Sequence, residues 1–310
     1  MRYYDFGKLE GSKIKISERL GKPLGLVDGS QVFSTMFMYE HEGKSSYELV
    51  LSTLGPENYR QICTITFNMT DTPGACAQVA KFLGERNIDI LNSSSLSMIS
   101  NICMVWRMMV DLSYYGDSVA LREEFGDLKR QRAASLSKVD AIEIEASNIS
   151  DRYTKGVAAS GSTVKVRSIK QYRKTNSTIK NGTFQVPEDY LRAIDNLAEG
   201  QPVMMVADQD SWILSITPMD PKSRLVELDF IIPDKPGAIF EITKVLADQN
   251  INLLSVSTKV LVYYETMSMN IVADVSNYGK DVEALRTTTE AHLAKLKGKF
   301  SLARIGSIDL

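Results

Sequence analysis

Apolar and polar residues alternate in two short stretches of the chain. From Cys63 to Met69 the odd positions are apolar and the even positions between them are polar. The same alternation returns at 226–232, with acidic residues in two of the polar places. Side chains of a β-strand point in turn to its two faces. Both stretches are therefore predicted to be strands with one face on a core.

A Pro-Gly pair follows each strand and introduces a stretch with the apolar spacing of a helix. The apolar positions are Cys76, Val79, Phe82, Leu83, Ile239, Ile242, Val245 and Leu246. Each helix is predicted to end near an asparagine, Asn87 or Asn250. Asparagine tolerates the left-handed conformation that often follows a helix C-terminus.

The two stretches belong to an internal repeat. The sequence DTPGA at 71–75 recurs as DKPGA at 234–238, and the shift of 234 − 71 = 163 residues also carries Asn87 onto Asn250. A fixed shift over a long span indicates two tandem copies of one unit. Such a chain can build its own pseudo-two-fold interface, where ligand sites often lie.

Each copy continues with two strands, a second helix and a last strand. The strands are expected at about 88–98, 102–113, 251–262 and 265–276. The second helix is expected to begin near Asp117 or Lys280, and the last strand near Val139 or Leu302. The order strand, helix, strand, strand, helix, strand predicts an α+β fold with two ferredoxin-like units, each with both helices on one face of an antiparallel sheet.

The repeated unit, with Asp-x-Pro-Gly-Ala between its first strand and helix, resembles an ACT domain. The resemblance covers roughly 60–147 and 223–310, and the second copy matches better through IPDKPGAI at 231–238 followed by NIN at 250–252. The resemblance implies a regulatory domain that binds a small effector, usually an amino acid, where two such domains meet.

The segment before each unit is also duplicated. Each contains a short helix, opened in the second copy by VPED at 186–189, then a glycine-containing turn and a hairpin. The first hairpin is longer, and its polar stretch 40–46 is expected to be an exposed tip. These segments resemble halves of an AbrB/MazE-type swapped-hairpin barrel, normally formed by two chains. The resemblance implies one small β-rich barrel built within this chain.

The repeats predict five segments. They are a first half-barrel at 1–58, a first ACT-like domain at 59–147, a linker at 148–163, a second half-barrel at 164–221 and a second ACT-like domain at 222–310. The small and polar composition of the stretch that ends in AASGS at 158–162 is typical of a linker.

The loop before the first helix of each ACT-like unit is the candidate effector site. A helix N-terminus offers free N–H groups to a carboxylate, and Gly74 and Gly237 allow close approach to the backbone. Asp71 and Asp234 either cap the helix or bind a ligand amine. The resemblance also implies that the start of the second strand lies near this site. The alternative is that the loops only turn the chain.

The candidate effector-binding residues follow from these two features. They are Asp71, Pro73, Gly74, Ala75, Asp89 and Asn92 in the first copy, and Asp234, Lys235, Pro236, Gly237, Ala238 and Asn252 in the second.

Charge suggests a second kind of partner. The net charge of −2 argues against a surface that coats nucleic acid throughout. The stretch 164–183, however, contains no acidic residue and could contact DNA phosphates. Its basic residues are Lys165, Arg167, Lys170, Arg173, Lys174 and Lys180. The alternative is a solvated segment between domains.

Enzyme chemistry is not expected. Cys63 and Cys76 align with Val226 and Ile239, which indicates core positions, and no histidine stands near a candidate nucleophile. Metal-type spacing and phosphate-binding glycine loops are missing from the sequence, so we expect no metal and no cofactor. The start MRYYD does not resemble a signal peptide, and apolar runs of membrane-spanning length are missing. These features predict a cytoplasmic protein without a membrane partner.

The sequence thus predicts a non-catalytic regulator of amino-acid metabolism. Its output is either DNA binding, as a transcriptional regulator, or binding to a metabolic enzyme as a regulatory or scaffold subunit. Exposed strand edges of the ACT-like sheets predict side-by-side pairing and a homo-oligomer.

Overall fold

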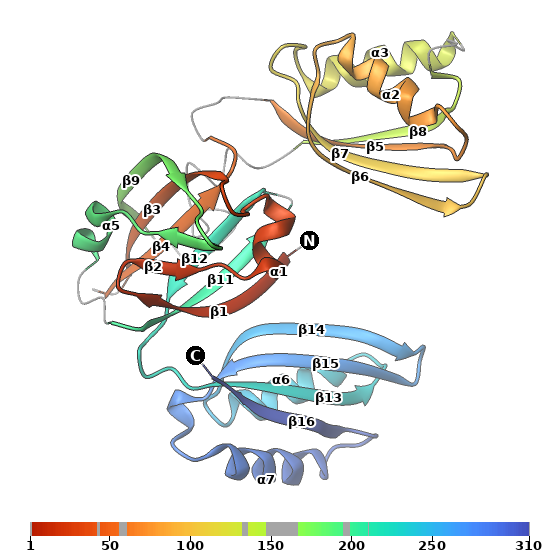
Figure 1. Ribbon diagram of the computed structural model, residues 1–310. Helices are drawn as coiled ribbons and strands as arrows, with labels where there is room; N and C mark the ends of the chain where they lie inside the picture. Colours follow the sequence, from red (N-terminus) through yellow and green to blue (C-terminus); the bar gives the residue numbers. More distant parts are fainter. Residues whose placement is uncertain are drawn as a thin grey trace. The chain divides into compact units, whose positions relative to one another are not determined.

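The computed structural model describes residues 2–41, 44–55, 61–131, 136–146, 167–194, 199–209 and 211–309. Within these residues the chain forms one eight-stranded sheet and two four-stranded sheets (Figure 1). The predicted mixture of helices and strands is confirmed. The predicted linker at 148–163 and the residues Glu42 and Gly43 of the predicted hairpin tip lie outside the described residues.

The first four-stranded sheet has the strand order β6-β7-β5-β8, and its neighbouring strands are antiparallel. Helices α2 and α3 lie on one of its faces (Figure 1). The elements along the chain are β5 (Ile62–Thr70), α2 (Ala75–Gly84), β6 (Asp89–Ile99), β7 (Cys103–Asp111), α3 (Ser118–Arg130) and β8 (Val139–Ala146). This is the order of elements that the sequence predicts for each copy.

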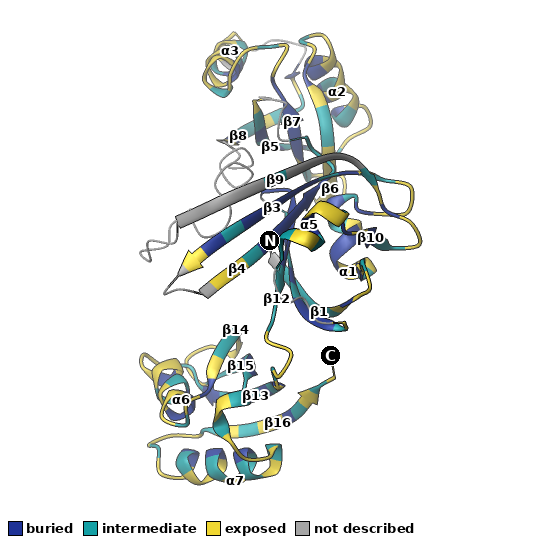
Figure 2. Cartoon of the chain, turned by 90° about the vertical axis from the view of Figure 1, so that its left-hand side faces the viewer, coloured by how far each residue is buried: buried dark blue, intermediate teal, exposed yellow. Residues whose placement is uncertain are grey.

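The second four-stranded sheet repeats this arrangement in the order β14-β15-β13-β16. Its elements are β13 (Leu225–Pro233), α6 (Ala238–Ala247), β14 (Asn252–Val262), β15 (Thr266–Asp274), the 3-10 turn η4 (Ser276–Tyr278), α7 (Val282–Leu293) and β16 (Ser301–Ile308). Helices α6 and α7 each have buried residues on one side and exposed residues on the other (Figure 2).

Local signals fix the helix ends. Asn87 and Asn250 have φ angles of 54° and 58°, so the predicted left-handed residues after α2 and α6 are confirmed. Asp117 Oδ1 accepts a hydrogen bond from Ala120 N at 2.8 Å, which caps the start of α3. Asp281 Oδ1 accepts one from Ala284 N at 2.7 Å in the same way at α7.

The core of each copy lies between the sheet and its helices. In the first copy Cys63, Ile65, Phe67 and Met69 of β5 are at most 2% exposed, and Phe67 packs against Phe125 with ring centroids 6.2 Å apart. Phe230 of β13 is 1% exposed and lies in the corresponding core of the second copy. The alternation in the sequence therefore marks the buried faces of both strands.

The eight-stranded sheet takes strands from both halves of the chain, in the order β10-β2-β1-β11-β12-β4-β3-β9. The first half supplies β1 (Arg2–Glu10), β2 (Lys13–Lys15), β3 (Gln31–His41) and β4 (Lys44–Ser52). The second half supplies β9 (Arg167–Thr178), β10 (Thr183–Gln185), β11 (Gln201–Asp208) and β12 (Ile213–Pro218). Pairs of strands from the two halves alternate, so neither half forms this sheet alone.

Short helices and buried side chains complete this sheet. The helices are α1 (Glu18–Gly21), η1 (Lys22–Leu24) and α5 (Glu188–Ala193). The buried carboxylate of Glu48 accepts hydrogen bonds from Tyr39 OH at 2.8 Å and from Ser215 Oγ at 2.6 Å. Because Ser215 belongs to the second half, this carboxylate joins the two halves across β4 and β12.

Candidate functional site

The N-termini of α2 and α6 form the two candidate effector sites. Gly74 and Gly237 directly precede these helices and have φ angles of 88° and 89°, a region that favours glycine. Within the described residues no side chain caps either helix. A Cβ built on Gly237 would meet nothing within 4 Å, so the first-turn N–H groups of α6 can be approached from solvent.

The aspartates of these loops do not cap the helices, so that alternative is wrong. Asp71 Oδ2 accepts hydrogen bonds from Ser97 Oγ at 2.7 Å and from Asn101 N at 2.9 Å, in the β6–β7 hairpin. Asp234 Oδ2 accepts one from Tyr264 N at 2.8 Å, in the β14–β15 hairpin. Each carboxylate therefore ties its loop to the turn of the neighbouring hairpin.

These hydrogen bonds affect the Asp71 carboxyl. The bond from Ser97, followed by the bond from the backbone of Asn101, lowers the pKa of Asp71 below its ordinary value. The carboxylate is thus held in its charged form, already bonded to the hairpin.

A different lysine lies at each loop. The ammonium of Lys138 donates to the carbonyl oxygen of Pro73 in the first copy. In the second copy Lys235 belongs to the loop itself and donates to the carbonyl oxygen of Lys297 at 3.1 Å. Each helix N-terminus therefore has one nearby cation that would add to its attraction for a carboxylate.

The remaining effector candidates lie at the other end of the sheet. Asp89 pairs with Asp111 at the start of β6, whereas Ile99, at its end, pairs with Cys103 beside the loop. Asn252 begins β14 in the same way. Within one copy the structure therefore does not bring Asp89, Asn92 or Asn252 to the Asp-x-Pro-Gly loop. The strand order could have shown this, because α2 returns the chain to the starting end of the sheet.

The basic segment coincides mainly with β9, the last strand in the order of the eight-stranded sheet. It contributes Arg167, Lys170, Arg173 and Lys174 to this strand, which pairs with β3 along its length. Lys180 is exposed between β9 and β10, and Lys165 lies outside the described residues.

Cys63 and Cys76 contact other side chains of the first copy. Cys63 is 2% exposed, and burial raises the pKa of its thiol to about 11. Cys76 Sγ lies 3.9 Å from Met104 Sδ, in a contact between two sulfur side chains. Among the described residues no cluster of His, Cys, Asp or Glu could hold a metal ion. In the same part of the chain no helix has the length and apolarity needed to cross a membrane.

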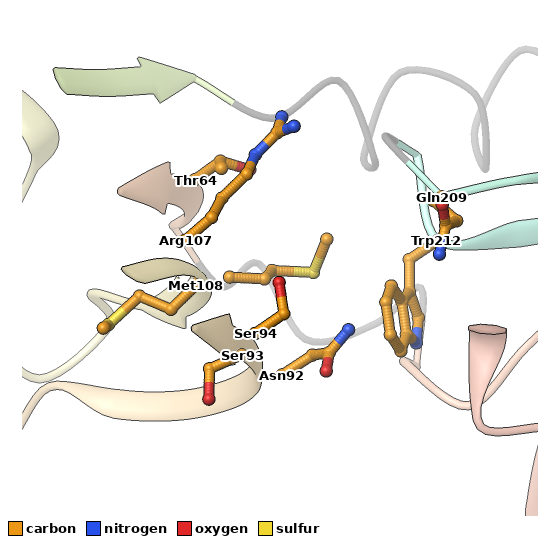
Figure 3. A pocket seen from close by; sticks show the side chains of 9 residues that line it. Thr64, Asn92, Ser93, Ser94, Arg107, Met108, Gln209 and Trp212 are labelled. Carbon is orange, nitrogen blue, oxygen red and sulfur yellow. The ribbon is translucent and has the colours of Figure 1, made fainter. Parts of the chain in front are cut away.

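A hollow that the sequence did not indicate lies on the face of the first four-stranded sheet that has no helices. Its volume is about 190 Å³. It is lined by Thr64, Asn92, Ser94, Arg107, Gln209 and Trp212, among others (Figure 3). Apart from Asn92, these are not among the residues singled out from the sequence, and the strand register of β5, β6 and β7 is what brings Thr64, Asn92, Ser94 and Arg107 together.

Comparison with known families finds a match in the second repeated unit. Residues 226–288 match the family model of the ACT domain. The matched stretch runs from the second residue of β13 into α7, and it includes the loop before α6. A search of the curated proteins finds no match.

Several solved structures align with most of the chain. A candidate glycine cleavage system transcriptional repressor is 15% identical, with 82% of this chain and 100% of that chain covered and a TM-score of 0.25. The acetolactate synthase small subunit from Thermotoga maritima is 11% identical, with 80% and 96% covered and a TM-score of 0.21. The regulatory subunit of aspartate kinase from Thermus thermophilus is 10% identical, with 75% and 93% covered and a TM-score of 0.20. At these TM-scores the alignments carry no structural argument.

Proposed function

We propose that the protein is a non-catalytic, amino-acid-sensing regulator whose effector binds at the loop before α6. The N-terminus of α6 carries this proposal. It lies in the segment that matches the ACT domain, Gly237 is exposed, and no described side chain caps the helix. Free N–H groups at the positive end of the helix dipole suit the carboxylate of an amino acid.

The complete site needs two ACT-like units, because Asn252 is remote from the loop of its own copy. In the proposed arrangement the loop 234–238 of one unit lies beside the start of β6 or β14 of another. Asp89, Asn92 or Asn252 then face the ligand amine. The edge strands β6 and β14 support such pairing, since most of their residues are exposed. The loop 71–75 of the first copy is the second candidate for the effector site.

The signal in this proposal passes through the aspartates. A ligand at the loop alters the backbone that carries Asp234, and Asp234 is bonded to the turn at Tyr264. The ligand shifts the protein between two states only if it binds one of them more tightly. The β14–β15 hairpin is the element whose position we expect to differ.

We further propose that the eight-stranded sheet is a swapped-hairpin barrel of the AbrB/MazE type, with the domain limits predicted above. The alternation of strand pairs from the two halves supports this reading. In this proposal the barrel responds to the state of the ACT-like units. DNA binding is the first candidate output, supported by the acid-free basic stretch at 167–180 in and after β9.

Binding to a metabolic enzyme is the second candidate output. It is favoured by apolar side chains exposed at the end of β14 and in the following turn. These are Val260, Leu261, Val262, Tyr263 and Tyr264, which are 45–78% exposed. Apolar groups in such number on one exposed edge are typical of a protein interface.

Calorimetry and thermal shift with the standard amino acids at millimolar concentration test the effector. We expect one of them to stabilise the protein and the variant Gly237→Ala to weaken its binding, because the added Cβ stands beside the N–H groups. The matched variant Gly74→Ala reports on the first copy. Stabilisation by none of the amino acids would contradict the sensor proposal.

A gel shift against genomic fragments at rising salt, with co-purification from the native cell, separates the two outputs.

A further inference from the structure

A small cavity lies within the second copy, where β13 begins and β16 ends. Its volume is about 240 Å³, and its described lining residues all belong to 223–309. Val226 and Val275 of this lining belong to the core between the sheet and its helices, and Val282 is the first residue of α7. The cavity therefore lies on the helix side of the sheet and not on the open face, by which we mean the face without helices. We refer to it as the α7 cavity.

The strand β13 separates the α7 cavity from the Asp-x-Pro-Gly loop. Arg224 directly precedes this strand and Asp234 directly follows it, which is a step of 234 − 224 = 10 residues. At a rise of about 3.3 Å per residue this step spans roughly 30 Å. The cavity and the effector site proposed above are therefore at opposite ends of the same strand.

Two opposite charges line the cavity on neighbouring strands. Leu225 of β13 pairs with Ile308 of β16, so the next residues toward the end of the sheet are Arg224 and Asp309. Arg224 Nη2 donates to the carbonyl oxygen of Lys280 at 2.8 Å. A guanidinium has five N–H donors, so this bond leaves others for a ligand. Among the described residues, no ion pair joins the Arg224 guanidinium to the Asp309 carboxylate.

The rest of the described lining is mostly aliphatic. It consists of Leu225, Val226, Val275, Val282 and Ile308, with hydroxyl groups from two serines. Leu225, Val226 and Val275 are at most 3% exposed, so they form the floor of the cavity. A guanidinium binds a carboxylate, a carboxylate binds an ammonium group, and aliphatic residues suit a short apolar side chain. A small aliphatic amino acid carries all three of these groups.

We propose that the α7 cavity binds a small aliphatic amino acid as its zwitterion. The ligand carboxylate lies at Arg224, its ammonium group at Asp309, and its side chain against the valines of the floor. This site lies within one copy and needs no second ACT-like unit, so it does not depend on the effector site proposed at the loop.

The α7 cavity adjoins the segment that connects β12 to β13. Ser223 Oγ donates to Asp274 Oδ2 at 3.0 Å, and Arg224 N donates to Ser276 Oγ at 2.9 Å. These bonds attach the connecting segment to the turn after β15. A ligand bound by Arg224 adds a contact to the same segment, so its binding should slow hydrogen exchange of the Arg224 amide.

The first copy provides an internal control for this site. Gln61 occupies the place of Arg224, because its carbonyl accepts from Leu112 N as the Arg224 carbonyl accepts from Val275 N, both at 2.8 Å. An amide at this place lacks the positive charge that would bind a carboxylate. We therefore expect no corresponding site in the first copy.

Methyl NMR on the full chain tests the proposal. The probes are L-alanine, L-valine and L-leucine, with 3-methylbutanoate and 2-methylpropan-1-amine as valine analogues that lack the amine or the carboxylate. We expect at least one amino acid to shift the methyl signals of Val282 and Ile308 with saturation. The two analogues should bind at least about tenfold more weakly than valine, since each loses one charged hydrogen bond. The methyl signals of Ile239, in the first turn of α6, report separately on the effector loop.

Two substitutions locate the binding. Arg224→Gln introduces the residue of the first copy, and Asp309→Asn removes the negative charge at nearly constant shape. Each should weaken the response of Val282 and Ile308 by at least about tenfold, whereas Gly237→Ala should leave it unchanged.

No saturable shift at Val282 and Ile308 with any of the three amino acids would overturn the proposal. Unchanged affinity in Arg224→Gln or in Asp309→Asn would do the same. A response of Ile239 that is lost in Gly237→Ala bears only on the effector site at the loop.

Discussion

The open faces of the two four-stranded sheets carry opposite charge arrangements on the same ladder of strands. In the first copy Thr66 of the central strand lies opposite Glu143, whereas in the second copy Asp229 lies opposite Arg304. The central position of β7 is Arg107, and that of β15 is Asn270. The duplication thus kept the ladder and changed its charges, so that two carboxylates of the second face, Glu227 and Asp229, are paired with Arg304.

The largest expected effect concerns the cores on the helix sides of the two sheets, where loss of a buried ring should destabilise both copies to a similar extent. Phe67→Ala and Phe230→Ala each remove a fully buried ring and should each destabilise their copy by about 3–5 kcal/mol. Phe67→Ala also loses the edge-to-face contact with Phe125, worth about 1 kcal/mol more. Urea unfolding followed by hydrogen exchange measures each copy. If only one of the two variants lost protection in its own copy, the two cores would not be equivalent.

An ion pair between Arg86, which follows α2, and Glu124 of α3 distinguishes the first copy. Arg86 Nε donates to Glu124 Oε1 at 2.9 Å, whereas the residue 163 positions later is Gln249. The change Arg86→Gln should therefore cost about 1.5–3 kcal/mol, the value of a hydrogen bond to a charged group. The reverse change, Gln249→Arg, has no carboxylate at the corresponding place, since Tyr278 OH bonds Thr288 Oγ1 there. We expect no gain of stability from it.

The same pair predicts a dependence on pH. The bond from Arg86 lowers the pKa of Glu124, outweighing the burial that would raise it. Because the folded pKa lies below the unfolded value of about 4.3, this stabilisation is present above that pH and is lost as the pH falls through the folded pKa. The difference in unfolding free energy between wild type and Arg86→Gln should therefore shrink below about pH 4. A difference that stays constant to pH 2 would exclude this carboxylate as its source.

Much of the repeated fold follows from local sequence. Alternation marked β5 and β13, and Asn87 and Asn250 marked the ends of α2 and α6. The constant shift did not extend to the end of each copy. It becomes 281 − 117 = 164 between the aspartates that cap α7 and α3, and 304 − 143 = 161 between the residues opposite Asp229 and Thr66. Turn lengths and a change of strand register cause these offsets, and neither is visible in residue type.

The sites were harder to predict than the fold. The spacing of Asp71 and Pro73 is that of a helix cap, but the carboxylate bonds Ser97 and Asn101, which are 26 and 30 residues away. The sequence did not indicate Arg107 as a residue that lines the hollow, because a single cation on a strand forms no motif. Contacts between distant segments decide both cases, and their partners are known only once the sheet has formed.

Substitution of Arg304 tests the ion pairs on the second open face, and its expected effect on stability is smaller than those above. Its guanidinium is bonded to Glu227 and to Asp229, at 2.9 Å for the bond from Nε to Asp229 Oδ2. Arg304→Ala leaves two neighbouring carboxylates without their cation and should cost about 1 kcal/mol, the upper end for exposed pairs. Arg107→Ala removes a guanidinium that lies 3.6 Å from the Glu145 carboxylate, and it should cost at most about 0.5 kcal/mol. Thermal unfolding at low and high salt compares the two. Equal losses would mean that the faces do not differ as described.

The smallest expected effect is local to the hairpin turns. Asp71→Asn weakens the bonds from Ser97 and from the Asn101 amide, and hydrogen exchange of the Asn101 amide should become faster while the core amides of β5 stay unchanged. Asp234→Asn should do the same for Tyr264. Since the folded pKa of Asp71 is lowered, the wild-type turn should itself loosen as the pH falls below about 3.9 and through that pKa. Asp71→Asn should remove this acid-induced loosening. If the Asn101 amide exchanges equally fast in both proteins, the carboxylate does not hold the turn, and the proposed route from loop to hairpin fails with it.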